Sequence, residues 1–440
     1  MELNALKDLL REMGAVGAGG AGFPSYAKLS DKADTVILNC AECEPLLKVH
    51  RQVLKEYVSE ILSALSEIVR SVGAKQGIIA VKSHYKRTLA ALEAEICDYP
   101  SLSICKLRSV YPAGDELILI KEVTGKVVDP GKLPISVGVI VFNTETVYNV
   151  YRAMQGHPVT HKFVTVAGEV ANPITLRVPI GTKISQLISA AGGETVEDAS
   201  YISGGPMMGK IVSSSDVITK TTNAIIVLPS DHTVILNKTR NASINLRRTM
   251  SVCCQCRTCT ELCSRHLLGY PVEPHMVMRV MSSGGKGYTY SLSGSLFCSG
   301  CGLCEAYSCP QGLSPRKIIE ALKAQARANG QKLPEGFKAD TDISDTSYKK
   351  VSVERLIMRL GLKKYNVSAP MQPDFVSDSV KIPLSQHIGA PAIPAVSVGD
   401  TVQAGSLIAK AADGALSVNI HSSINGHVDA ITEKYIKITK

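Results

Sequence analysis

Nine of the thirteen cysteines in this chain lie between Cys253 and Cys309, and this clustering is the feature that most restricts what the chain can fold into. Within each of two runs, three cysteines follow one another at two-residue gaps. This spacing lets one tight loop reach three corners of an iron–sulfur cube, while the fourth ligand comes from elsewhere. A tetrahedral zinc site uses pairs of cysteines on longer loops, so a triple run would leave a ligand unused. The spacing predicts two [4Fe–4S] clusters, with zinc as the alternative.

The two runs match the two-cluster ferredoxin pattern, in which the fourth cysteine of each run binds the other cluster. This crossing predicts two ligand sets, which are Cys253, Cys256, Cys259 and Cys309 for one cluster and Cys298, Cys301, Cys304 and Cys263 for the other. Cys254 remains as an alternative to Cys253. Cys40 and Cys43 form an isolated C-x-x-C pair, and Cys97 and Cys105 are predicted to be core residues.

Length and composition indicate a large globular protein of a reducing cytoplasm. The 440 residues suffice for about three domains, and 45% of them are hydrophobic. The net charge of +9 is spread along the chain, which argues against nucleic acid or a membrane surface as a partner. No apolar stretch approaches the ~20 residues of a membrane span, and no secretion signal opens the chain. An odd number of clustered cysteines argues against a disulfide framework.

The amino-terminal region combines a glycine-rich loop with alternating strands and helices. Residues 2–13 have the spacing of an amphipathic helix, and a glycine-rich segment follows at 14–24. Because no strand precedes this loop, a Rossmann fingerprint is not supported, although its backbone N–H groups can approach a phosphate. The alternation downstream predicts a parallel α/β sheet, with strands at 35–38 and 77–81 and helices at 53–72 and 87–96.

Several separated motifs resemble, in the same order, those of complex I flavoprotein subunits and, more closely, those of the RnfC proteins of the Rnf electron-transport complex. They are the glycine loop with Lys28, and the segments 39–45, 111–116, 142–146 and 204–209, followed by both cysteine runs. The resemblance implies an FMN held by the loop and by polar side chains, with NADH stacking beside it near Phe23, Glu44 and Asp115. The cofactor-binding residues implied are Gly17, Gly19, Gly20, Gly22, Phe23, Lys28, Asn39, Glu42, Glu44, Asp115, Glu116 and Asn143.

The same resemblance, together with the local patterns, implies a multidomain α/β protein. The expected parts are a complex I flavoprotein-like FMN/NADH-binding α/β domain (1–158), a β-grasp soluble-ligand-binding (SLBB) domain (159–232), a ferredoxin-like two-cluster helical domain (243–330), a linker with a short helix (331–378) and a barrel-sandwich hybrid β domain (379–440). A helix is expected from Pro315 to Ala328 with Ser314 as its N-cap. The last domain has no lysine at its hairpin tip, 413–423, so covalent attachment of a carrier group is not expected.

The position of the last domain distinguishes two subfamilies. RnfC proteins generally carry such a module near the amino terminus, whereas this order resembles the cobalamin reductases of propanediol-utilisation microcompartments. The resemblance implies electron transfer from NADH through FMN and two [4Fe–4S] clusters to cobalamin, or to a cobalamin adenosyltransferase as partner. An Rnf-type protein that exchanges electrons with ferredoxin is the alternative. Whether the protein sits inside a microcompartment and contacts its shell proteins is left open, as is a targeting role for residues 2–13.

Overall fold

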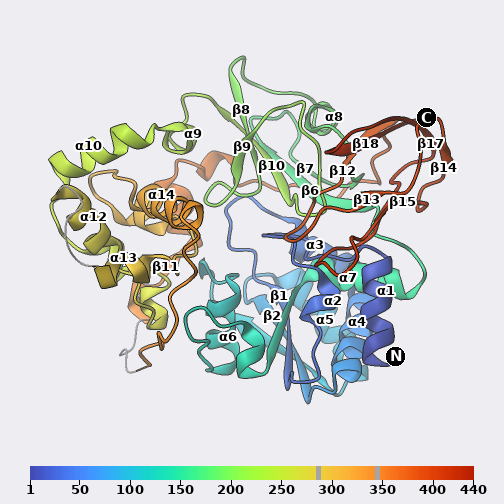
Figure 1. Cartoon of the computed structure of the whole chain (residues 1–440), viewed down its shortest axis with the longest axis horizontal. Coiled ribbons are helices and arrows are strands. Elements are labelled where there is room, and N and C mark those ends of the chain that lie inside the picture. Colours follow the sequence, from blue (N-terminus) through green and yellow to red (C-terminus); the bar gives the residue numbers. More distant parts are fainter. Residues whose placement is uncertain (284–288, 342–346) are drawn as a thin grey trace.

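The computed structural model describes residues 1–283, 289–341 and 347–440, which form four packed parts. Figure 1 shows an α/β domain below, a β-grasp domain above it, a cysteine-rich helical domain to one side, and a carboxyl-terminal β module beside the amino-terminal helix. Residues 342–346 of the predicted linker and 284–288 of the predicted cluster domain lie outside the described residues. Among the described residues, no helix is both long enough and apolar enough to cross a membrane.

The α/β domain is built on a parallel four-stranded sheet, as the sequence predicts. Its strand order is β3-β2-β1-β5, with bounds Leu102–Leu107, Gln76–Lys82, Thr35–Cys40 and Val139–Asn143. Alternate residues of β1 enter different cores: Val36 and Leu38 face the helices of one side, and Ile37 faces the other. The first face is covered by α1 (Leu3–Glu12), α3 (Val49–Glu56), α4 (Val58–Val72), α5 (Lys86–Glu95) and α7 (Thr144–Met154), and the second by α6 (Glu116–Thr124).

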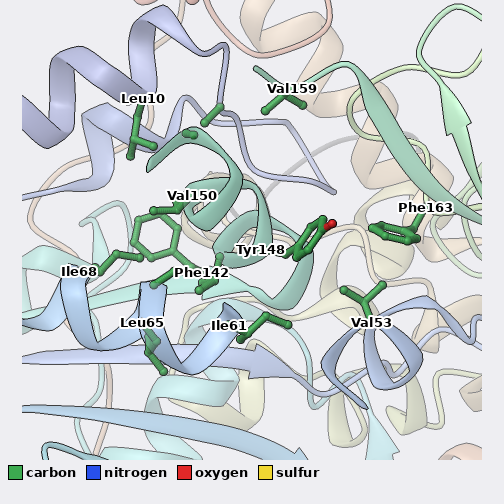
Figure 2. Close-up of a cluster of buried hydrophobic side chains, with 14 of the residues drawn as sticks. Leu10, Val53, Ile61, Leu65, Ile68, Phe142, Tyr148, Val150, Val159 and Phe163 are labelled. Atoms are coloured by element: carbon green, nitrogen blue, oxygen red, sulfur yellow. The ribbon is translucent and has the colours of Figure 1, made fainter. Parts of the chain in front are cut away.

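Two local predictions for this domain are wrong. The helix expected over 53–72 is two helices, because the backbone leaves the helical region at Tyr57 (φ −126°, ψ 43°). The break brings the Tyr57 ring to 4.5 Å from that of Tyr148 and 5.8 Å from that of Phe163, two residues of the core that Figure 2 shows. Cys97, predicted to be a core residue, is exposed in the short 3-10 helix Ile96–Asp98 that follows α5. Cys105 is half-buried and packs against the core beside α6.

The β-grasp domain has a mixed five-stranded sheet that packs on one helix. The strand order is β7-β6-β10-β8-β9, with bounds Ile174–Pro179, His161–Gly168, Ala224–Pro229, Ala199–Ser203 and Lys210–Val212. The pairing of β6 with β7 is antiparallel, and β10 runs parallel to β6. Helix α8 (Ile184–Ala190) contributes Ile184, Leu187 and Ile188 to the core beneath the sheet.

The cysteine-rich domain is helical and is tied to the α/β domain by a short strand pair. Its helices are α9 (Thr233–Thr239), α10 (Ala242–Val252), α11 (Thr258–Glu261), α12 (Pro274–Ser282), α13 (Thr289–Ser295) and α14 (Pro315–Ala328). The predicted bounds of α14 are confirmed, although Ser314 makes no side-chain hydrogen bond as its N-cap. Downstream, β11 (Val351–Ser352) pairs with β4 (Val110–Tyr111) and leads into α15 (Val353–Arg359).

The carboxyl-terminal module consists of two small sheets and lies on the side of the molecule where α1 is found (Figure 1). The first has the order β12-β18-β17-β14 (Ser379–Pro383, Tyr435–Thr439, Gly426–Ile431, Thr401–Val402), and the second β13-β15-β16 (Ile393–Pro394, Leu407–Lys410, Ile420–His421). The backbone N–H of Asn419 donates to the Arg11 carbonyl at 3.1 Å. The module therefore packs directly on the helix that leads into the glycine loop.

A buried lysine joins three of the four parts. Lys220 lies between β9 and β10 of the β-grasp domain, and its ammonium donates to the carbonyls of Gly14 (2.7 Å) and Asn419 (3.3 Å). Both acceptors are neutral oxygens, so the ammonium is taken from water without a compensating charge. Burial lowers the pKa of Lys220 to about 7.

The folded chain is therefore expected to become more stable as pH rises above 7. Between pH 7 and the ordinary lysine pKa of 10.5, the unfolded chain holds the proton of Lys220 and the folded chain does not. In this range Lys220 alone raises the free energy of unfolding of the protein by up to ~1.4 kcal/mol per pH unit. Thermal melts at pH 7, 8 and 9 should show a smaller gain in melting temperature for Lys220→Met than for the unchanged chain. Equal gains would contradict the assignment.

Candidate functional site

The structure brings together the four cysteines of the first predicted set. Cys253, Cys256, Cys259 and Cys309 line one cavity, and Cys254 and His275 lie at the same cavity. The loop around it is shaped by two residues with positive φ, Gln255 (56°) and Arg257 (64°). His275 is held by Thr260, whose hydroxyl lies 2.8 Å from its Nδ1 atom.

The second predicted set also surrounds a cavity of its own. Cys263, Cys298, Cys301 and Cys304 line it, so each run contributes three cysteines to one cavity and one to the other. Gly300 and Gly302 have positive φ at the same two positions of this run that Gln255 and Arg257 occupy in the first. The loop therefore turns inward in the same way, and the Gly300 N–H points to the Cys298 sulfur at 3.3 Å.

The chemistry of these thiols fits an iron cluster. Burial, with neighbouring thiols adding to it, raises the pKa of Cys259 to about 12 and that of Cys263 to about 12. Such thiols become thiolates only against a strong positive charge, which iron supplies. In the parts of the chain that are described, no group of three or more His, Cys, Asp and Glu side chains is placed to hold one metal ion. Four thiols around a cavity suit a cube in which each iron binds one of them.

A second site lies where the order of the parallel sheet reverses. From β1 the chain moves outward through β2 to β3 on one side, and β5 lies on the other side. Asn39 and Asn143 face each other in register at the carboxyl ends of β1 and β5. Ligands of open α/β sheets bind in the crevice at such a reversal. The Asn39 amide donates to the Gly114 carbonyl at 2.9 Å, and Asn143 accepts from the Thr146 N–H at 2.8 Å as the N-cap of α7.

The glycine loop runs across this same edge, and Gly19 and Gly22 leave no room there for a side chain. A Cβ atom on Gly19 would lie 2.6 Å from the Asn223 Nδ2 atom and 3.5 Å from that of Asn143. Gly20 and Gly22 have φ values of 60° and 66°, which glycine adopts readily. The loop is fixed by hydrogen bonds from the Gly17 N–H to the Phe23 carbonyl (2.9 Å) and from the Ala18 N–H to the Thr146 hydroxyl (2.9 Å). A close backbone approach of this kind fits a phosphate-bearing cofactor.

Lys28 supplies the positive charge at this edge. Its ammonium donates to the Glu116 carboxylate at 2.8 Å and to the Val141 carbonyl at 3.0 Å. It also lies 6.0 Å from the ring centroid of Phe142. The structure thus places the glycine loop, Lys28, Asn39, Glu116 and Asn143 around one edge of the sheet.

Three other carboxylates of the predicted set are engaged elsewhere. Glu42 accepts from the His50 N–H at 2.7 Å, at the start of α3. Glu44 accepts from the backbone N–H groups of Met207 and Met208 at 2.9 and 2.8 Å, so it binds the β-grasp domain. Burial raises the pKa of Glu44 while these two N–H groups oppose the rise.

Asp115 connects the α/β domain to the second cysteine cavity. It accepts two hydrogen bonds from the Arg265 guanidinium, at 2.8 and 2.9 Å, and Arg265 is two residues beyond Cys263. It also accepts from the Leu117 and Ile118 N–H groups as the N-cap of α6. In the described structure Glu44 and Asp115 each make a contact between domains.

Sequence reasoning missed the residues that close the glycine loop from the other domains. Asn223 packs on Gly19, and its Oδ1 atom accepts from Lys162 at 2.7 Å. Lys162 in turn forms an ion pair with Glu145, and both side chains are 1% exposed. On the other side of the loop, Ile388 of the carboxyl-terminal module donates from its N–H to the Ala21 carbonyl at 2.9 Å. In the sequence, the one indication of this network is Lys162, a charged residue in the otherwise largely apolar strand β6.

Family models match the chain in the order of the four parts described above. They are the Nuo51 FMN-binding domain (10–152), the SLBB domain (163–210), the 4Fe-4S dicluster domain (252–314) and the RnfC barrel sandwich hybrid domain (357–440). The expected fold class and the FMN and [4Fe–4S] cofactors are thereby confirmed. Zinc in the cysteine runs is not supported by the dicluster match.

Curated relatives match over the full length of the chain. The cobalamin reductase PduS of Citrobacter freundii is 40% identical over 442 residues, covering 100% of this chain and 97% of that protein. The PduS protein of Salmonella typhimurium is also 40% identical, covering 100% of this chain and 98% of the relative. A component of the Na(+)-translocating ferredoxin:NAD(+) oxidoreductase complex of Acetobacterium woodii is 32% identical, covering 61% of this chain and 59% of that component.

A solved structure shares the fold at low sequence identity. It is an NAD+-reducing [NiFe]-hydrogenase in the H2-reduced state, with a TM-score of 0.51 and 19% identity. The match covers 78% of this chain and 69% of the hydrogenase chain. This likeness concerns the arrangement of the elements alone.

Proposed function

This chain belongs to the family of the cobalamin reductase PduS, an oxidoreductase family, and on that basis we propose that it reduces cobalamin with electrons from NADH. In this proposal FMN lies at the edge formed by the glycine loop, Asn39 and Asn143. The two cysteine quartets are the ligands of two [4Fe–4S] clusters. Two relatives of full length named as cobalamin reductases support the acceptor.

The observation that carries the proposal is the segment 111–116, which contacts both the flavin edge and the second cysteine cavity. The Gly114 carbonyl accepts from Asn39, and the next residue, Asp115, is paired with Arg265. At the start of the segment, the Tyr111 hydroxyl donates to the Cys301 carbonyl at 2.6 Å. In this proposal an electron passes from FMN to the second cluster, and this one short segment of backbone connects the two sites.

The same contacts suggest the order in which electrons pass through the two clusters. The second cavity is the one in contact with segment 111–116, and Cys263, Cys301 and Cys304 are buried there. At the first cavity, Cys256 is exposed. We therefore expect electrons to enter at the second cluster and to leave from the first, which lies nearer the surface.

The residues at the flavin edge have binding and orienting roles. FMN, when bound, supplies the conversion between transfer of a hydride and transfer of single electrons. The glycine loop offers backbone N–H groups for its phosphate, and Lys28 adds a positive charge. Asn39 and Asn143 fix the two strand ends, while Asn223 closes the loop from the β-grasp domain. In this proposal NADH binds beside Phe23, while Glu44 and Asp115 are engaged between domains in the described structure.

An Rnf-type role is the second candidate. It is favoured by the match to the Acetobacterium woodii protein, which extends over 61% of this chain. In that role the chain would dock on membrane partners and exchange electrons with ferredoxin. A cobalamin adenosyltransferase, or the shell of a microcompartment in the cytoplasm, would be the partner in the favoured role.

The experiment that decides between them is anaerobic. The chain is loaded with flavin and clusters, NADH is added, and reduction rates are compared with cob(III)alamin and with ferredoxin as acceptors. We expect NADH to bleach the flavin absorbance and cob(III)alamin to be the faster acceptor. Faster reduction of ferredoxin would favour the Rnf-type role. Failure of NADH to bleach the flavin would show that NADH is not the electron donor.

A further inference from the structure

A cavity of ≈330 Å³ lies between the α/β domain and the cysteine-rich domain, against residues 111–113 of the segment described above, and the function proposed above assigns it no ligand. It is distinct from the flavin edge: its lining includes neither Asn39, nor Asn143, nor any residue of the glycine loop. Pockets for small organic ligands start at about this size. The volume suits a small ring system and is far too small for a corrin.

The cavity touches the loops that carry the second set of cysteines. Leu303, between Cys301 and Cys304, forms part of its wall, as does Ser264, which follows Cys263. The Ser264 hydroxyl lies 3.6 Å from the Cys301 sulfur. An occupant of the cavity would be separated from the cluster by the ligand loop alone.

The lining combines apolar walls with a cationic rim. Side chains such as Val110, Ile118 and Leu267 form the walls. The charged residues of the lining are the cations Arg108, Lys121, Lys349 and Lys350 and the carboxylate Glu122. Two of these cations are already paired, Lys349 with Glu261 and Lys350 with Glu122. Over the residues that the structure describes, Arg108 and Lys121 have no carboxylate within ion-pair distance, and Lys121 reaches the Leu267 carbonyl at 3.5 Å.

We propose that this cavity binds an aromatic anion, with its ring between the apolar walls and its acidic group at Arg108 and Lys121. Apolar walls favour the ring through the water that it displaces. Guanidinium and ammonium groups recognise phosphate, sulfonate or carboxylate through charge-assisted hydrogen bonds. The binding itself does not depend on NADH or cobalamin as substrates. Because the cavity borders the loop of the second cluster, a redox-active ring bound there would lie close enough to exchange electrons with that cluster.

The test uses the chain loaded with FMN and clusters, so that the flavin edge is filled. Anaerobic calorimetry compares 1-naphthalenesulfonate with 1-naphthalenesulfonamide, which has the same ring without the charge. We expect one site for the sulfonate and about tenfold weaker binding of the sulfonamide, because the charge-assisted hydrogen bonds are lost. Equal affinities for the two probes, or no binding of the sulfonate, would overturn the proposal.

Variants locate the binding within the molecule. Arg108→Gln combined with Lys121→Gln should weaken the sulfonate about tenfold and leave the sulfonamide unchanged. Lys106→Gln, which removes a cation of β3 two residues before Arg108 and outside the cavity, is the matched control and should change neither probe. Ile118→Trp should fill the cavity and abolish binding of both. Sulfonate binding that survives the double substitution would place the site elsewhere, and flavin and iron contents establish that each variant is folded.

Competition identifies the natural class of ligand. FMN and riboflavin share one ring system, and only FMN carries a phosphate. Displacement of the sulfonate by FMN at a lower concentration than by riboflavin would support recognition of ring and anion together. Displacement by inorganic phosphate alone, at the same concentration as by FMN, would show an ion site and would overturn the part of the proposal that concerns the ring.

Discussion

Replacing Cys259 with serine is expected to remove one cluster and leave the other cluster and the flavin in place. Cys259 lines the first cavity with Cys253, Cys256 and Cys309, and a cube that loses one of four thiolate ligands is poorly held. The iron content should fall by about half, since each of two clusters holds the same number of irons. Iron and acid-labile sulfide per chain, together with flavin absorbance, measure the result.

The matched control is Cys254→Ser. Cys254 lies at the same cavity but outside the predicted ligand set, so this substitution should retain the full iron content. Loss of iron from Cys254→Ser but not from Cys253→Ser would show that Cys254, and not Cys253, is the cluster ligand. Loss of both clusters and the flavin from Cys259→Ser would point to misfolding instead of ligand loss.

The same series tests the order of the clusters. With the first cluster missing in Cys259→Ser, NADH should still reduce the second cluster, because segment 111–116 connects it to the flavin edge. In Cys301→Ser the second cluster is missing, and reduction of the first should become slow although the flavin is still bleached. The opposite pattern in the two variants would place the first cluster next to the flavin.

Replacing Lys162 with methionine is expected to destabilise the protein by about 3–5 kcal/mol, because it leaves the Glu145 carboxylate buried without its partner. The ion pair joins α7 to the β-grasp strand β6, and both side chains are 1% exposed. For 440 residues that unfold cooperatively, the melting temperature should fall by roughly 3–5 °C. Flavin affinity should also fall, because Lys162 holds Asn223 against Gly19.

Two control variants separate the effect of the unpaired Glu145 charge from the effect of changing the side chain at position 162. Lys106→Met removes an exposed pair with Glu93 (55% and 51% exposed) and should cost less than ~1 kcal/mol. Adding Glu145→Gln to Lys162→Met removes the buried charge and should recover part of the lost stability. A melting temperature of Lys162→Met equal to that of the unchanged chain would show that the pair adds nothing to stability.

The elements of this protein were predictable where the pattern is local. The parallel sheet follows from apolar strands that alternate with helices, and the bounds of α14 follow from Ser314-Pro315 and the helical spacing after it. The break at Tyr57 was not predictable in this way, because the apolar spacing continues through it. What interrupts the helix is packing of the Tyr57 ring against Tyr148 and Phe163, which lie far along the chain.

By itself the sequence determined the kind of chemistry. Two-residue gaps between cysteines set which thiols can share a loop, and that constraint acts over a few residues. Only the tertiary structure decided how distant residues meet. Glu44 binds the β-grasp domain, Asp115 binds Arg265, and Asn223 closes the glycine loop. Such contacts depend on how whole domains pack, and no spacing along one segment of chain encodes them.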